Sequence, residues 1–339
     1  NYTTQNFAGM HDWILVGQGS ANHTEVLAQQ SALELQPTGS YGTTYDAIID
    51  QTDSFVQIRI PSTEWKAKWT EAVIESTGTQ IKIVDAIQKL FPDKFDFLII
   101  AHNFEDRPAD WPAYAGKFMR YQNNVQGLGV PILDDRYISQ NLKGIIIDPT
   151  YRLEHGLLIH EIVHNWGQRV IPDGGKHWDA VEIRGALGGL GQNVQTNGDG
   201  TYTIDEEADR ATPGLVDTLP NIELYLMGLV PAESVQPLTW YDGLERIKAD
   251  EISTIFRANQ RITTIEDIVS KHGARQPNWQ NSQKEFRGIV VLVTPQAISQ
   301  SLSNQLDSQI RGFEEYFSTV TSGLARLSLT GLTQFSLAR

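Results

Sequence analysis

The sequence predicts an α+β fold, a twisted mixed sheet packed against helices with a β-rich region at the N-terminus. Two apolar runs, at residues 97–100 and 289–293, are typical of strands that are buried on both faces. Apolar side chains recur at helical spacing between residues 302 and 320, which indicates an amphipathic helix. Strands and helices of this kind bury their apolar faces against one another in layers.

The N-terminal region shows strand-like alternation followed by a helix. The first sixty residues are rich in Gly, Thr, Ser and Gln, and polar and apolar side chains alternate over residues 54–60. The apolar spacing predicts a helix over residues 79–90, which Pro92 ends. We therefore expect two regions, a β-rich N-terminal region over residues 1–92 and a main domain over residues 93–339.

The middle of the chain alternates strands and a helix. Residues 95–101 and 144–147 are nearly continuous apolar runs, and each predicts a buried strand. Residues 151–166 predict a helix, because Gly167 stands where a helix commonly ends.

The segment from 168 to about 219 is rich in Gly and has little pattern. A long irregular segment in a compact domain is usually functional, so we expect this one to form a wall of a site. Within it, Asn197-Gly198-Asp199-Gly200 predicts a hairpin turn between short strands. Near the C-terminus, Leu327 and Leu329 suggest a closing strand.

Composition limits the classes of function. Lys+Arg 27 against Asp+Glu 41 gives a net charge of −14 without a basic cluster, so we expect no nucleic-acid partner. No apolar run approaches the roughly 18 residues that a membrane span needs. A hydrophobic content of 40% is typical of folded globular proteins, and we expect a monomer.

Cysteine is absent, which excludes disulfides, thiolate catalysis and cysteine-based metal sites. Any bound metal would therefore use His, Asp or Glu. Charged residues make up only 20% of the chain while neutral polar residues are plentiful, which favours an exported protein. The sequence begins at Asn1 without a signal peptide, as a processed chain would, so we expect a secreted, extracellular protein.

The most informative segment is His-Glu-x-x-His, formed by His160, Glu161 and His164 on the predicted helix. At about 100° per residue the two His lie about 40° apart, so both imidazoles leave one face, with Glu161 beside them. This spacing suits two nitrogen ligands on one Zn²⁺ and a carboxylate that can take a proton from water. The alternative is a pair of histidines that hydrogen-bond on a buried helix. The apolar residues of the opposite face are Leu158, Ile159, Ile162, Val163 and Trp166.

This helix resembles the active-site helix of the zincin metallopeptidases, whose shared motif is the one at His160, Glu161 and His164. Gly167 is similar to the glycine that turns the chain towards a third His in the metzincin branch of that family. Residues 223–229, Glu-Leu-Tyr-Leu-Met-Gly-Leu, resemble the methionine-bearing turn that lies beneath the metal in the same branch.

Together with Lys176-His177-Trp178, these motifs are similar to those of a poorly characterised group of secreted bacterial metallopeptidases. The similarity extends over residues 95–300, and its most specific part is the His-Glu-x-x-His motif.

The sequence departs from the metzincin pattern at the third ligand. The third His of that branch would fall at Val170, which cannot bind a metal. His177 is the expected replacement, because Gly174 and Gly175 just before it allow the chain to fold back. The alternative role of His177 is that of a surface or core residue beside Trp178.

Four acidic residues remain open as third ligands, namely Asp173, Asp179, Glu206 and Glu207. Some metzincin-like peptidases use Asp, and one branch takes its third ligand from a later helix. Glu206 or Glu207 would suit that branch, although the spacing to the following Asp differs from its pattern by one residue.

The resemblance also implies supporting roles for two residues of the methionine-bearing segment. Met227 would lie in the turn beneath the metal, and Tyr225 would donate to an oxyanion or cap the metal. The alternative for each is an ordinary buried residue.

The resemblance implies a zincin-like domain with an active-site helix under a cleft. Its activity would be that of a secreted zinc-dependent endopeptidase acting on a protein or peptide substrate. His160, His164 and His177 would hold Zn²⁺, and Glu161 would be the general base. The alternative is a non-catalytic glycan- or protein-binding module on a zincin scaffold, compatible with the 8 Trp, in which Glu161 would have no chemical role.

Overall fold

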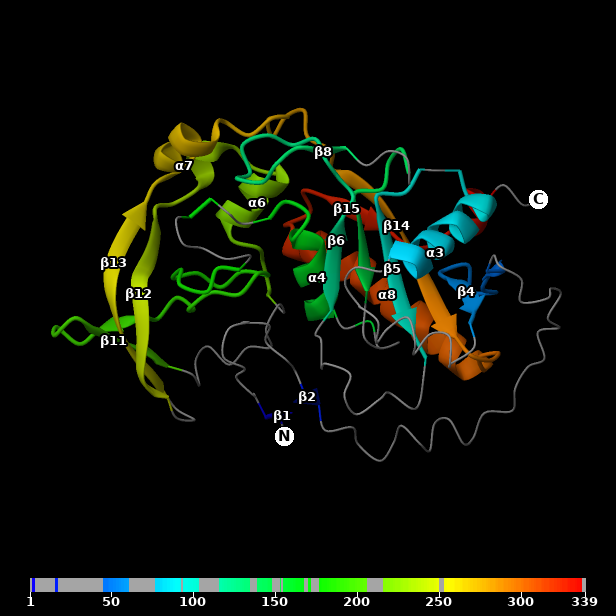
Figure 1. Cartoon of the computed structure of the whole chain (residues 1–339), viewed down its shortest axis with the longest axis horizontal. Coiled ribbons are helices and arrows are strands. Elements are labelled where there is room, and N and C mark those ends of the chain that lie inside the picture. Colours follow the sequence, from blue (N-terminus) through cyan, green and yellow to red (C-terminus); the bar gives the residue numbers. More distant parts are fainter. Residues whose placement is uncertain are drawn as a thin grey trace.

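The computed structural model describes residues 2–3, 16–17, 45–60, 77–92, 94–103, 116–134, 139–147, 153, 155–167, 170–171, 177–205, 216–249 and 253–336. Among these residues it is an α+β protein with five α-helices, a large mixed sheet and a second, antiparallel sheet (Figure 1). The fold class that the sequence predicts is confirmed at this level.

The large sheet has seven strands and a parallel centre. β4, β14, β5 and β9 lie side by side and run parallel, while β3 pairs antiparallel with β4 and β6 antiparallel with β9. β15 pairs with the first part of β14. The strands are, in sheet order, β3 (Ala47–Ile49), β4 (Val56–Arg59), β14 (Glu285–Thr294), β5 (Phe97–His102), β9 (Gly144–Ile147) and β6 (Lys117–Arg120), with β15 (Arg326–Ser328) beside β14.

Alternate residues of the central strands pack into two cores on opposite faces of this sheet. In β5, Phe97 and Ile99 belong to one core, and Leu98 and Ile100 to the other. The first core contains residues of α4 (His155–Val163) and α8 (Gln300–Val320), and the second contains residues of α3 (Thr77–Leu90). Helices therefore cover both faces, which explains the continuous apolar runs (Figure 1).

Most of the predicted elements are confirmed. The predicted strands at 54–60, 95–101, 144–147 and 289–293 correspond to β4, β5, β9 and β14, and the predicted helices at 79–90 and 302–320 correspond to α3 and α8. Leu327 lies in β15, and Leu329 is buried just beyond it. The helix expected over residues 151–166 is α4, and residues 151, 152 and 154 lie outside the described residues.

The expected boundary near Pro92 falls between β4 and β5, which both pair with β14. The described part of the N-terminal region thus shares the large sheet with the rest of the chain. Of the β-structure expected in the first sixty residues, β1 (Tyr2–Thr3), β2 (Val16–Gly17), β3 and β4 are seen, and the remainder lies outside the described residues.

The second sheet is antiparallel and has the order β10-β11-β13-β12. Its strands are β10 (Gln195–Thr196), β11 (Thr201–Asp205), β13 (Ser253–Thr263) and β12 (Leu238–Ala249). Residues 197–200 connect β10 to β11, so the predicted hairpin turn is confirmed. Long β12 and β13 form the hairpin at the left of Figure 1.

Short elements complete the described fold. They are α6 (Asn221–Met227), α7 (Ile265–His272), η1 (Ala232–Ser234), η2 (Leu332–Gln334), and the strand pair β7 (Gln122–Asn123) and β8 (Leu133–Asp134). None of the helices in the described part of the chain is long and apolar enough to cross a membrane.

Candidate metal site

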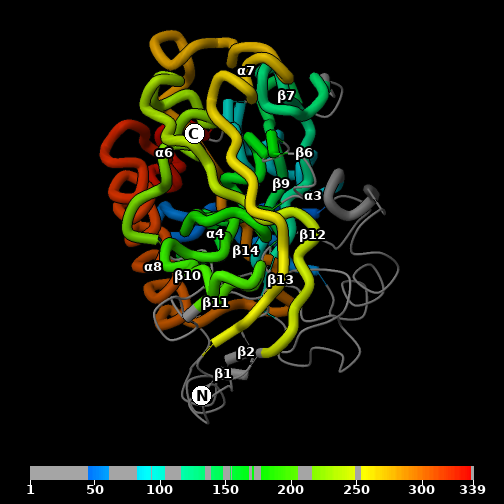
Figure 2. Tube along the Cα trace, turned by 90° about the vertical axis from the view of Figure 1, so that its left-hand side faces the viewer, coloured from blue at the N-terminus to red at the C-terminus, as the bar shows by residue number. Residues whose placement is uncertain are grey.

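α4 carries the His-Glu-x-x-His motif and lies between the two sheets. Figure 2 shows it behind β12 and β13, and Figure 1 shows it beside β6, the edge strand of the large sheet, which it contacts. Its apolar face is buried as predicted, and His160 and His164 are half-buried on the other side. Burial of the apolar face fixes the rotation of the helix and hence the direction of both imidazoles. The buried residues of that face are Leu158, Ile159, Ile162, Val163 and Trp166.

The end of α4 is held by a tight turn and by an arginine of β6. The amide of Gly167 donates to the carbonyl of His164 at 3.1 Å, and Gly167 has a φ of 67°, which a glycine adopts without strain. The guanidinium of Arg120 donates to the carbonyls of His164 and Asn165. These contacts satisfy the last carbonyls of the helix and fix the backbone that carries His164.

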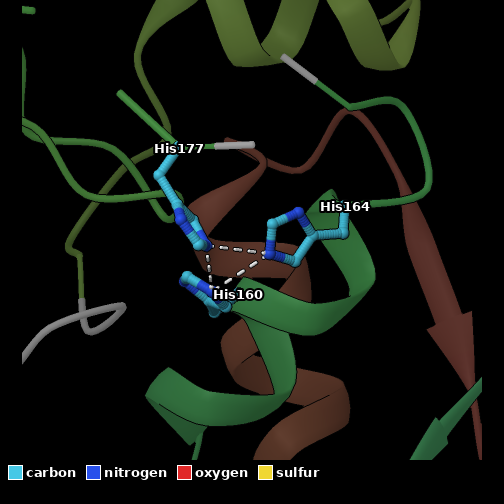
Figure 3. Close-up of side chains that lie close together, drawn as sticks. All are labelled: His160, His164 and His177. Carbon is cyan, nitrogen blue, oxygen red and sulfur yellow. Dashed lines mark hydrogen bonds between the residues drawn. The ribbon is translucent and has the colours of Figure 1, made fainter. Parts of the chain in front are cut away.

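Three imidazoles converge at this site, those of His160, His164 and His177 (Figure 3). The Nε2 atom of His164 lies 3.1 Å from that of His160, and the Nε2 atom of His177 lies 3.2 Å from each of the other two. Among the described residues, this is the group of His, Asp and Glu side chains whose ligand atoms come close enough together to hold a metal ion.

The triangle of nitrogens has the dimensions of a tetrahedral zinc site. Zn–N distances of about 2.0–2.1 Å place the nitrogens of such a site about 3.3 Å apart. The observed separations of 3.1 and 3.2 Å are close to that value. The three imidazoles therefore fit a zinc ion that keeps a fourth position for water or substrate.

A backbone carbonyl selects the tautomer of His160. Its Nδ1 atom lies 2.7 Å from the carbonyl oxygen of Ala186, which can only accept a hydrogen bond. Nδ1 must therefore carry the proton, and Nε2 presents its lone pair to the other two rings. A lone pair on Nε2 that points at two other ring nitrogens is suited to bind a metal ion.

His177 stands at the start of a segment that returns towards α4. The next residue, Trp178, is fully buried, and its backbone amide donates to the carbonyl of Leu187 at 3.0 Å. Val170, at the position of the metzincin ligand, is buried in the apolar core. The structure thus brings His177 together with His160 and His164, as the sequence analysis expects.

Of the four acidic residues that could be the third ligand, one does not join the three imidazoles and the other three lie outside the described residues. Asp179 is half-buried two residues beyond His177 and does not belong to the group of converging ligand atoms. Asp173, Glu206 and Glu207 lie outside the described residues, as do Gly174 and Gly175.

Glu161 is buried, with 4% of its surface exposed, and lies against the start of β6. A Cβ atom added to Gly116 would come within 2.9 Å of Oε1 of Glu161 and 2.8 Å of Cδ1 of Leu157. Gly116 therefore leaves the space that the carboxylate occupies. A carboxylate next to two imidazole ligands can accept a proton from a water molecule at the metal.

Met227 and Tyr225 lie on α6, and both are buried. The hydroxyl of Tyr225 accepts a hydrogen bond from the backbone amide of Arg275 at 3.3 Å. The guanidinium of Arg275 donates to the carbonyls of Leu226 and Met227, so it caps the end of the helix. These contacts show how the segment is held, and the roles of Met227 and Tyr225 at a metal remain predictions.

Glu223 is a buried acidic residue of this region for which the sequence predicts no role of its own. Its side chain is completely buried on α6 and accepts hydrogen bonds from Trp178, Ala186 and Leu187. Burial raises the pKa of the Glu223 carboxyl, and the three N–H donors oppose that shift. The one signal in the sequence was an acidic residue inside an otherwise apolar stretch.

Comparison of the chain with protein-family models, with curated proteins and with solved structures finds no match. The resemblance to the zincins therefore stays a prediction from the sequence.

Proposed function

We propose that this protein is a secreted zinc-dependent endopeptidase of the zincin type, acting on a protein or peptide substrate. The observation that carries the proposal is the convergence of three Nε2 atoms within 3.2 Å of one another, with Glu161 next to one of the ligands on the same helix. A purely structural pair of histidines needs neither the third imidazole nor the buried carboxylate.

Each residue has one task in this proposal. His160, His164 and His177 would hold Zn²⁺, which when bound polarises a carbonyl group and lowers the pKa of bound water towards about 7. Glu161 accepts a proton from the attacking water and then delivers it to the leaving amine. Its side chain is buried against Gly116, which limits the positions that the carboxylate can take.

The zincin-like architecture, with α4 under a cleft, is part of the proposal. It is supported by the mixed sheet, by the antiparallel strand β6 at its edge, and by the contacts of α4 with β6 and β9. In this arrangement the polar face of α4 is turned away from the large sheet and its apolar core.

Substitution Glu161→Gln tests the mechanism. The amide cannot accept the proton, so hydrolysis of a denatured protein substrate should fall by at least about 10²–10⁴-fold with zinc content unchanged. The matched control is Glu233→Gln, an exposed glutamate of η1, which should keep the full rate. Cleavage by the Glu161 variant at the parental rate would refute the peptidase mechanism. A zinc-loaded parent that cleaves nothing would favour the binding module instead.

A further inference from the structure

We infer that Glu223 is the positioning residue of the candidate metal site, holding His160 and His177 in place from behind. The inference rests on the proposed zinc site, and it assigns to the Glu223 carboxylate the task of orienting two of the three histidines. Glu223 touches neither the imidazoles nor the metal position directly, and its effect passes through one peptide group and one indole ring.

The first connection runs through the peptide group between residues 186 and 187. The amide of Leu187 donates to Oε1 of Glu223 at 3.0 Å, and the carbonyl of Ala186, on the same peptide, accepts from Nδ1 of His160 at 2.7 Å. The carboxylate therefore polarises the peptide whose oxygen holds the imidazole. A stronger acceptor at Nδ1 makes Nε2 of His160 a better metal ligand.

The second connection runs through the residue that follows His177. The indole Nε1 of Trp178 donates to Oε1 of Glu223 at 2.9 Å, and the ring is fully buried. The backbone of Trp178 is joined in turn to the carbonyl of Leu187. One carboxylate thus binds both ends of the segment from Trp178 to Leu187. His177 directly precedes this segment, and Ala186, which accepts from His160, lies near its end.

Residues 185–187 leave space for the Glu223 carboxylate and donate hydrogen bonds to it. Oε2 of Glu223 also accepts from the amide of Ala186 at 2.9 Å, so both oxygens face N–H groups. An added Cβ at Gly185 would lie 2.5 Å from Oε1 of Glu223, so only glycine leaves room for the carboxylate there. All three described partners are N–H donors, and their hydrogen bonds favour the ionised carboxylate while burial opposes it.

An ionised Glu223 also suits a site for a dication. A fully buried carboxylate is costly, and no ion pair with Lys or Arg satisfies it in the part of the chain that is described. Two hydrogen bonds link it, through the peptide group between residues 186 and 187, to His160, which would bind the metal. A negative charge at that distance stabilises the loaded site more than the empty one.

A residue that only anchors α6 would act on the fold alone, so the test separates metal affinity from stability. The substitution is Glu223→Gln, which preserves shape but replaces one acceptor with an amide that donates. The matched control is Glu233→Gln, which makes the same change of charge on an exposed side chain. Zinc affinity is measured by competition with a chromophoric chelator, the Co²⁺ absorption spectrum reports ligand geometry, and melting of the metal-free proteins reports stability.

We expect Glu223→Gln to bind zinc about 10–100-fold more weakly than the parent and to alter the Co²⁺ spectrum, with the control unchanged. Parental zinc affinity in Glu223→Gln, whatever its melting temperature, would overturn the inference. A parent chain that binds no zinc would refute the proposed function itself, which is a separate result.

If Glu223→Gln does not fold, Trp178→Phe decides the question, because it keeps an aromatic side chain at this buried position and removes the N–H donor to Glu223. This variant should bind zinc several-fold more weakly and retain its fold. Zinc affinity equal to that of the parent would count against the inference.

Discussion

At the residue scale, each of the three imidazoles is held by a different contact. His160 donates to the carbonyl of Ala186, and His164 lies in a turn that Arg120 caps. His177 precedes a fully buried tryptophan. Because these anchors come from different parts of the chain, the loss of one ligand leaves the other two oriented.

The first prediction concerns the third ligand. We expect His177→Ala to weaken zinc binding by more than about 100-fold, because the ion then keeps only two protein ligands. Asp179→Ala should change the zinc affinity little, since its carboxylate lies outside the converging group. Competition titration of both variants measures the difference, and a stronger loss in the Asp179 variant would assign the third position to the carboxylate.

The second prediction concerns the space beside Glu161. Substitution Gly116→Ala adds a methyl group within 2.9 Å of the carboxylate and should displace it, so hydrolysis should fall by about 10-fold or more while zinc stays bound. Gly243 serves as the control, because its φ of 66° is also positive but an added Cβ meets nothing within 4 Å. Equal rates for Gly116→Ala and Gly243→Ala would show that the contact with Glu161 has no bearing on activity.

At the element scale, α6 is fixed at both ends. Glu223 in its first turn binds the segment that carries His177, and Arg275 caps its last carbonyls. Burial lowers the pKa of Arg275 to about 10, so the guanidinium stays protonated at neutral pH. The charge is stabilised there by the carbonyl groups at the helix C-terminus.

The third prediction follows from this cap. Substitution Arg275→Ala leaves the carbonyls of Leu226 and Met227 without their donor and should lower the free energy of unfolding by about 2–3 kcal/mol. Arg257, an exposed residue of β13 paired with Glu245 at 3.5 Å, provides the control, whose replacement should cost less than about 1 kcal/mol. Denaturant unfolding of both variants gives the comparison, and equal losses would mean that the cap contributes nothing.

The elements that could be predicted are those whose pattern is local. β5 and β14 are buried on both faces, so their apolar runs identify them, and α8 buries one stripe along its whole length. The hairpin of β12 and β13 has no such pattern, because much of it is exposed on both faces and carries charged side chains.

The candidate site likewise has residues that the sequence predicts and one that it does not. His160, Glu161 and His164 lie within five residues on α4 and the turn that directly follows it, so helical spacing alone predicts that the two imidazoles leave one face with Glu161 beside them. Glu223 could not be predicted, because its three donors lie 36, 37 and 45 residues away in the chain. Its role follows from tertiary contacts that no local pattern records.

At the scale of the whole molecule, we expect the candidate site to add little to the stability of the fold. Two apolar cores lie on either side of the large sheet, and a smaller one packs against the second sheet. A chain of this size does not depend on a metal to fold, unlike a zinc finger.

The fourth prediction is that a chelator such as 1,10-phenanthroline abolishes hydrolysis without unfolding the protein. Far-UV circular dichroism should be unchanged at room temperature, and added zinc should restore the activity. Loss of the folded signal on chelation would instead identify the metal as a structural one.

The most direct test of the central claim is a crystal structure with anomalous scattering recorded on both sides of the zinc absorption edge. We predict one zinc peak about 2.0–2.1 Å from Nε2 of each of His160, His164 and His177, with water in the fourth position and Glu161 beside it. A peak bound by a different set of residues, or no zinc peak in crystals grown with the metal, would contradict the account.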